Sequence, residues 1–187
     1  MQYRALVVLL LRPASGCGAQ FAALERVRAA HDHAYRRWRP HITLIPPFLL
    51  DEEGLSARLE SLAAALAPVC AAAAPHTLTL AALGTFRLRR YHNIHLVPAD
   101  AAPLAALQEQ LSAAAAASGI PPSTQPFAAH ASLGQSYSAA DKARIAAGAQ
   151  HALGLRVPVD HVAIMYKPAG APGGYAMYRE LPLGPAA

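Results

Sequence analysis

The chain has 187 residues, the length of one ordinary domain, and its composition excludes several classes of protein. Apolar residues make up 54% of the chain and charged residues 14%, which excludes an intrinsically disordered protein. Two cysteines, Cys17 and Cys70, are too few for a disulfide-rich scaffold. The net charge of +5 comes almost entirely from arginine, whose planar guanidinium suits phosphate oxygens. The composition therefore permits an anionic partner such as RNA without specifying one.

The N-terminal segment favours a buried strand over an export signal. Nearly continuous apolar residues predict a strand over Tyr3–Leu11. Arg4, the short apolar run and Cys17 loosely imitate a lipoprotein signal, but Arg12 and Pro13 stop the run at once. A membrane helix needs about 20 apolar residues, so we expect no membrane span and a cytoplasmic location.

Helices and strands follow one another along the rest of the chain. Apolar residues at helical spacing predict helices, and runs rich in valine, threonine and leucine predict strands. In chain order we expect a helix over Gln20–Arg37, a strand over His41–Ile45 closed by Pro46 and Pro47, a helix from Asp51 bounded by Pro68 and Pro75, strands over Thr77–Leu83 and Asn93–Val97, a helix over Pro103–Ser118, a strand over His130–Leu133 broken by Gly134, a helix from Ser138 to about His151, and strands over Arg156–Tyr166 and Tyr175–Leu181.

This order predicts an α+β fold. We expect one domain over residues 1–187, because no linker separates two parts of the chain. The two halves resemble each other, since each offers a strand, a helix and a short strand that begins with histidine. We therefore expect two lobes with antiparallel sheets, formed roughly by residues 1–75 and 76–187.

Two short motifs carry the chemistry. Each has histidine, one apolar residue and then a hydroxyl residue: His41 with Thr43, and His130 with Ser132. Residues i and i+2 of a strand point to the same face, so each motif places an imidazole beside a hydroxyl. An imidazole moves protons near neutral pH, and a hydroxyl donates hydrogen bonds to anionic oxygens. One copy would more often be a buried core histidine, but two copies indicate a pair that grips a phosphodiester from both sides.

The flanks of these motifs resemble the 2H phosphoesterase superfamily, which includes proteins called 2′-5′ RNA ligases and RNA 2′,3′-cyclic phosphodiesterases. The resemblance rests on residues 37–48 and 127–134, and the order of elements extends it over nearly the whole chain. It implies a bilobal fold with two pseudo-symmetric lobes and an active-site groove between them. It also implies hydrolysis of 2′,3′-cyclic nucleotides, or of RNA ends bearing a 2′,3′-cyclic phosphate, to 2′-phosphates, with no metal and no cofactor.

The same resemblance implies a role for each motif residue. His130 would accept a proton from the attacking water, and His41 would give a proton to the departing 3′ oxygen. Thr43 and Ser132 would hold the non-bridging oxygens as negative charge develops on them. With a 5′-hydroxyl in place of water, the same site would join this hydroxyl to the cyclic phosphate, which is an ATP-independent 2′-5′ RNA ligase reaction.

The second motif departs from the usual pattern. Gln135 stands where many relatives have a basic residue, which removes a positive charge near the phosphate. Arg39, Arg87, Arg89 and Arg90 are the arginines that could supply this charge instead, and the sequence does not choose among them.

Aromatic residues near the motifs are candidates for stacking on a base. Phe48, Phe127 and Tyr137 are as well explained by substrate binding as by core packing. For Trp38 and Phe86 we expect core packing.

The remaining histidines show no constellation of their own. His31 and His33 flank Asp32 in a predicted helix, where i and i+2 diverge, so we expect a solvated helix end and not a metal site. His92 and His95 could line the groove, but surface or paired histidines are the preferred interpretation.

Three classes of function remain, in decreasing order of support. The first is a cyclic phosphodiesterase, the second an RNA-binding module without turnover, and the third an interaction domain that uses the arginine-rich helix Gln20–Arg37. No membrane and no obligatory protein partner is expected for any of them.

Overall fold

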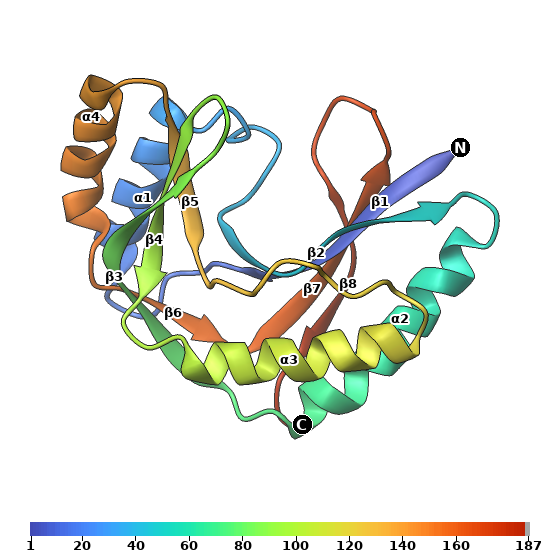
Figure 1. Ribbon diagram of the computed structural model, residues 1–187. Coiled ribbons are helices and arrows are strands. Elements are labelled where there is room, and N and C mark those ends of the chain that lie inside the picture. Colours follow the sequence, from blue (N-terminus) through green and yellow to red (C-terminus); the bar gives the residue numbers. More distant parts are fainter. Residues whose placement is uncertain (186–187) are drawn as a thin grey trace.

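A computed structural model describes residues 1–185 and shows two antiparallel sheets of four strands with helices on their outer sides (Figure 1). The first sheet has the strand order β2-β1-β7-β8 and the second the order β5-β4-β3-β6. The elements are β1 (Gln2–Leu10), α1 (Gly18–His31), β2 (His41–Asp51), α2 (Leu55–Ala72), β3 (His76–Arg87), β4 (His92–Pro98), α3 (Ala102–Ala117), β5 (Ala131–Ser136), α4 (Ala139–Ala149), the 3₁₀ turn η1 (Gln150–Ala152), β6 (Leu155–Val159), β7 (His161–Pro168) and β8 (Ala176–Pro182). The predicted α+β fold with two lobes is confirmed.

The two lobes exchange helices. Helix α1 connects two strands of the first sheet, β1 and β2, but packs on β5 and α4 of the second lobe. Helix α3 connects two strands of the second sheet, β4 and β5, but packs on β2 and α2 of the first lobe. Strands β7 and β8 then return to complete the first sheet. Unlike the expected division at residue 75, each lobe draws on both halves of the chain.

Strand β1 is buried on both faces, which explains its nearly continuous apolar sequence. One face, with Val7 and Leu9, belongs to the main core beneath the helices. The other face contributes to a smaller apolar cluster that consists of Leu6, Val8, Leu10, Ala163 and Met165 and is covered by Trp38 and Tyr175. This smaller cluster lies on the side of the first sheet that faces away from the main core.

Two strands differ from their expected limits. Strand β2 continues through Pro46 and Pro47 to Asp51, because β2 is an edge strand and its exposed prolines need no partner on the open side. The single strand expected over Arg156–Tyr166 divides at Asp160 into β6 and β7, which belong to different sheets. A continuous apolar run does not reveal where the chain passes from one sheet to the other.

Three glycine and proline positions also differ from expectation. Gly134 lies inside β5 and does not end it. Helix α2 begins after Gly54, which has a φ of 75°, and not at Asp51. Pro68 lies inside the last turns of α2 and does not bound the helix.

Among residues 1–185, α2 is long and apolar enough by length and composition to cross a membrane, with a mean hydropathy of 1.3. The sequence had predicted no such segment. Leu59, Leu62 and Leu66 of α2 are buried in the main core, and core helices of globular proteins meet the same criterion.

A substitution at Gly134 tests the contact between β5 and the end of α1. A Cβ atom at this position would lie 2.6 Å from the Cβ and 2.7 Å from the carbonyl oxygen of His31. We expect Gly134→Ala to cost about 1–3 kcal/mol through overpacking, which corresponds to a fall in Tm of about 2–12 °C in thermal unfolding. Gly18→Ala is the control, because nothing lies within 4 Å of its Cβ position, and its Tm should stay unchanged or rise. An unchanged Tm in Gly134→Ala would contradict the contact.

Candidate active site

The two histidine motifs lie on the edge strands β2 and β5, which contact each other where the lobes meet. Two pockets form there, and each combines one residue from each motif. His41 and Ser132 line a pocket of about 190 Å³, and Thr43 and His130 line a pocket of about 140 Å³. The structure therefore brings together the four residues that the motifs predicted.

The register of the strands turns both motifs into this groove. His41 lies opposite Leu10 and Thr43 opposite Val8, so both share the face of the smaller apolar cluster. On the other lobe, Ser132 lies opposite His95 of β4. The intervening residues of both motifs are buried in the main core.

A β-bulge follows each motif at the same place. The extra residue is Leu44 on β2 and Leu133 on β5. On β2, the carbonyl of Leu44 accepts a hydrogen bond of 3.1 Å from the side chain of Gln108 on α3. On β5, the bulge brings Gln135 into the same pocket as Ser132, although strict alternation would separate residues three apart. The bulges are a second sign of the internal symmetry, after the exchanged helices.

Each catalytic candidate imidazole is held by the backbone two residues before it. Nδ1 of His41 lies 2.8 Å from the carbonyl oxygen of Arg39, and Nδ1 of His130 lies 2.8 Å from that of Ala128. A carbonyl oxygen only accepts, so Nδ1 carries the hydrogen in both rings. Nε2 is then the atom of each ring that can take or give a proton.

The electrostatic surroundings favour the neutral form of His41. Burial lowers the pKa of His41, and the hydrogen bond to the Arg39 carbonyl opposes this change. The charges of Arg28 and His130 lower the pKa further, while that of Asp32 raises it. In the free protein, Nε2 of His41 therefore presents a lone pair at neutral pH.

A buried ion pair shapes the loop that leads to His41. Arg28 is 2% exposed and binds the carboxylates of Asp32 at 3.0 Å and Glu25 at 2.9 Å. It also donates a hydrogen bond of 2.8 Å to the carbonyl oxygen of Trp38. Asp32 in turn accepts the N–H of Ala34 at 2.9 Å, which ends α1 at residue 31 instead of residue 37. The expected helix end lies here, with His33 exposed to solvent, but Asp32 itself is buried.

Two aromatic rings lie beside the imidazoles. The ring of Trp38 lies 4.5 Å from that of His41 and 4.1 Å from that of Tyr175, measured between centroids. Phe86 is 36% exposed and meets the ring of His130 edge-on at 4.8 Å. The prediction of core packing was wrong for Phe86, whereas Trp38 both covers the smaller apolar cluster and lines the pocket of His41.

Asn93 and His95 of β4 position Ser132. His95 is 2% exposed, and burial together with the charge of His130 lowers its pKa to about 4. Its Nδ1 lies 3.1 Å from Oδ1 of Asn93, whose Nδ2 donates to Oγ of Ser132 at 3.2 Å. The hydroxyl of Ser132 also makes a long hydrogen bond of 3.5 Å to Oδ1 of Asn93, which its hydrogen would exchange for an anion in the groove. Gly84 makes this possible, because a Cβ atom there would lie 2.3 Å from Nε2 of His95.

Residues 18–171 match the family model described as the 2′-5′ RNA ligase superfamily. The chain belongs to this family. The expected resemblance to the 2H phosphoesterases is thereby confirmed. No curated protein matches the chain.

Solved structures of other proteins share the fold of this family member. One described as a phosphoesterase has a TM-score of 0.65 and 17% identity, with 98% of this chain and 99% of that chain covered. Escherichia coli LigT complexed with 3′-AMP has a TM-score of 0.63 and 17% identity, with coverage of 98% and 99%. Kluyveromyces marxianus Usb1 has a TM-score of 0.56 and 12% identity, with coverage of 96% and 98%.

Two of the other predicted substrate-binding residues of this family member line the groove. Phe127 lines the pocket of His130, and Gln135 lines the pocket of His41. The side-chain oxygen of Gln135 accepts the N–H of His33 at 2.9 Å, so this amide also connects β5 to the loop before His41.

Three predicted residues lie elsewhere. Phe48 is 6% exposed in the main core, because it pairs with Ala5 on the core face of β1, so core packing and not substrate binding is the interpretation that holds for it. Tyr137 is exposed and stacks on His33 outside both pockets. Arg39 holds His41 through its carbonyl oxygen, while its side chain lines a neighbouring pocket.

The sequence interpretation missed Arg28 and Asn93, whereas His95 is a paired histidine, as preferred, but is buried behind Ser132. The alternation of Asn93 and His95 on one strand was the available signal, but the pairing of β4 with β5 was needed to place them beside Ser132. Among the described residues, no group of three or more His, Cys, Asp or Glu side chains is arranged to hold a metal ion.

The low pKa of His95 has a measurable consequence. Its imidazole should stay neutral, with hydrogen on Nδ1, until the pH falls to about 4, as nitrogen-detected NMR of the histidine rings would report. Between pH 6.5 and 4 the unfolded chain binds a proton that folded His95 does not, so the free energy of unfolding should fall as the pH falls.

His95→Gln is the matched control, because the amide can still donate to Asn93 but does not titrate. Urea unfolding at pH 7 and pH 5 should show a smaller loss of stability in this variant than in the unchanged chain. A His95 titration midpoint at or above 6.5 would overturn the assignment.

Proposed function

We propose that the protein hydrolyses the 2′,3′-cyclic phosphate of a nucleotide or RNA end to a 2′-phosphate, with His41 and His130 as the acid–base pair. One observation carries the proposal: two imidazoles on facing edge strands, each with Nδ1 held by a carbonyl and each sharing a pocket with the hydroxyl of the other motif. Membership of the 2′-5′ RNA ligase superfamily supports a phosphoesterase or ligase that acts on RNA.

Related structures support a nucleotide substrate. LigT was solved with 3′-AMP and Usb1 with uridine monophosphate, and both share the fold of this chain. The 2′,3′-cyclic phosphate is the finer part of the proposal and rests on the resemblance of the two motifs.

The proposed reaction uses both lobes. A water molecule attacks phosphorus opposite the 3′ oxygen, and Nε2 of His130 takes a proton from this water. The P–O3′ bond breaks as Nε2 of His41 gives its proton to the departing oxygen, which leaves a 3′-hydroxyl and a 2′-phosphate. Thr43 and Ser132 donate hydrogen bonds to the non-bridging oxygens, where negative charge increases in the transition state.

The acid role of His41 depends on the substrate. Burial lowers the pKa of His41 in the free groove, but a phosphodiester anion beside the ring favours its charged form. Arg28 lines the same pocket, but its charge is balanced by two carboxylates. The two hydroxyls and the charged imidazole are therefore the groups that we expect to bind the phosphate.

Ligation is the alternative outcome at the same site. A 5′-hydroxyl that attacks phosphorus in place of water would expel the same 3′ oxygen and form a 2′-5′ bond. We expect hydrolysis to dominate, because water is in large excess over any 5′-hydroxyl.

The test is incubation with 2′,3′-cyclic AMP in the presence of EDTA. We expect 2′-AMP as the product, and we expect His41→Ala and His130→Ala each to lower kcat by about 10²–10⁴-fold, the usual contribution of a proton-transfer group. Chromatography that separates the 2′ and 3′ isomers is the measurement. His151→Ala is the matched control, since His151 is exposed on η1, and its kcat should be unchanged.

Each other outcome points to a different conclusion. The 3′ isomer, or product formed only without EDTA, contradicts the mechanism. Binding of the cyclic nucleotide without turnover would favour the RNA-binding module instead. Unchanged thermal unfolding of the two alanine variants shows that any lost activity is not lost folding.

The dependence of kcat/KM on pH is a separate test. An acid and a base that act together give a bell-shaped curve with two midpoints. Because burial lowers the pKa of His41 in the free protein, one midpoint should lie below the usual histidine value of 6.5. A single sigmoid would show that only one titrating group matters, and would contradict the pair.

A further inference from the structure

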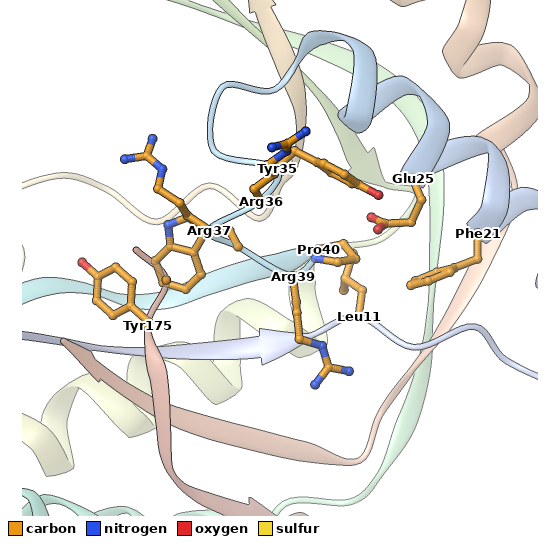
Figure 2. Close-up of a pocket in the computed structure, with 11 residues that line it drawn as sticks. Leu11, Phe21, Glu25, Tyr35, Arg36, Arg37, Arg39, Pro40 and Tyr175 are labelled. Atoms are coloured by element: carbon orange, nitrogen blue, oxygen red, sulfur yellow. The ribbon is translucent and has the colours of Figure 1, made fainter. Parts of the chain in front are cut away.

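A large pocket adjoins the groove but contains neither histidine. It has a volume of about 550 Å³, and three arginines of one loop, Arg36, Arg37 and Arg39, spread to different sides of it (Figure 2). Trp38 and Pro40 line both this pocket and the pocket of His41, so the two spaces are neighbours that share a wall.

A third space extends this pocket along the first lobe. It has a volume of about 250 Å³ and is lined by Arg4, Arg37 and Lys167, together with Trp38, Tyr175 and the loop between β7 and β8. Among residues 1–185, no acidic side chain lines it. We call the two spaces together the cationic basin, defined by Arg4, Arg36, Arg37, Arg39 and Lys167.

The charge of the cationic basin is not balanced by neighbouring acids. In the described part of the chain, none of its five cations takes part in an ion pair. Glu25 is the one acidic side chain among the described residues that line the larger pocket, and it is already bound to Arg28. Uncompensated cations gathered around a concave surface attract anions.

The walls of the cationic basin are held in place by contacts. Nζ of Lys167 donates to the carbonyl oxygens of Ala171 at 2.6 Å and Gly173 at 3.2 Å, which fixes the loop between β7 and β8. Gly174 of that loop touches the loop before β2, since a Cβ atom there would lie 2.8 Å from the carbonyl oxygen of Arg37. Tyr175 stacks on Trp38 across the same junction.

We propose that the cationic basin binds the sugar–phosphate backbone of single-stranded RNA next to the end that lies in the groove. This inference rests on the proposed function. A cyclic mononucleotide has one phosphate, and the two histidine motifs bind it. The cations beyond the groove therefore have a ligand only when the substrate carries further phosphates. Arginines interleaved with aromatic rings are typical of surfaces that bind single strands. The protein therefore prefers the end of an RNA chain to a mononucleotide.

The binding test uses a fluorescently labelled RNA tetranucleotide with a 3′-phosphate, which is not a substrate for hydrolysis. Its Kd is measured by fluorescence anisotropy at several salt concentrations for Arg4→Gln and Arg37→Gln. Each lost phosphate contact should reduce the slope of log Kd against log salt by about 0.7 and weaken binding about 3–10-fold at low salt. Arg156→Gln is the matched control, because this exposed arginine lies on β6, at the far edge of the second sheet from β5, and it should behave like the unchanged chain.

The catalytic test compares two substrates in the same variants. The ratio of kcat/KM for a tetranucleotide with a cyclic end to kcat/KM for 2′,3′-cyclic AMP should fall in Arg4→Gln and Arg37→Gln but not in Arg156→Gln. An unchanged ratio together with unchanged salt slopes overturns the proposal that the cationic basin binds RNA. A polyglutamate peptide of equal charge that displaces the RNA equally well also overturns it, because the surface would then respond to charge alone.

The two proposals fail separately. If neither substrate is hydrolysed, the proposed function fails, while the anisotropy measurements still decide whether RNA binds in the cationic basin. If both substrates are hydrolysed and the basin variants bind RNA normally, only the further inference fails.

Discussion

The buried cation Arg28 connects the two halves of the active-site groove. A guanidinium that is 2% exposed is costly unless its hydrogen bonds are satisfied, and Asp32, Glu25 and the carbonyl of Trp38 satisfy them. Arg28 lies on α1, which packs on the second lobe, whereas Trp38 leads into β2 of the first lobe. The position of one imidazole relative to the other therefore depends on how this one side chain is paired.

The internal symmetry extends from the topology down to single hydrogen bonds. Each half contributes an edge strand, a histidine held by the carbonyl two residues earlier, a hydroxyl and a bulge at the following leucine. The surroundings of the two halves differ. Ser132 is positioned by Asn93 and His95, and Trp38 covers the ring of His41. Such differences would let two similar imidazoles take the opposite roles that we propose for them.

The sequence predicted what depends on local patterns. The alternation in the two motifs was enough to place His41, Thr43 and Ser132 on strands and His130 directly before one, and the family pattern predicted that they meet in one groove. Prediction from sequence failed where the pairing of strands distant in the chain decides the structure. The break at Asp160 follows from a change of sheet, and the bulges that turn Gln135 inward and leave Phe48 in the core follow from register. Arg28 and His95 appeared ordinary in sequence because their burial, and the contacts that lead from them to Trp38 and to Ser132, depend on tertiary structure.

Because the helices are exchanged, the single chain has the connectivity of a domain-swapped dimer whose two subunits have been joined. Each half lends its first helix to the sheet of the other half, so neither half can bury its own apolar faces alone. Opening the groove by a hinge motion would have to pull α1 or α3 away from the lobe on which it packs. The width of the groove is consequently a property of the folded core, and a substrate meets two imidazoles whose spacing was set when the chain folded.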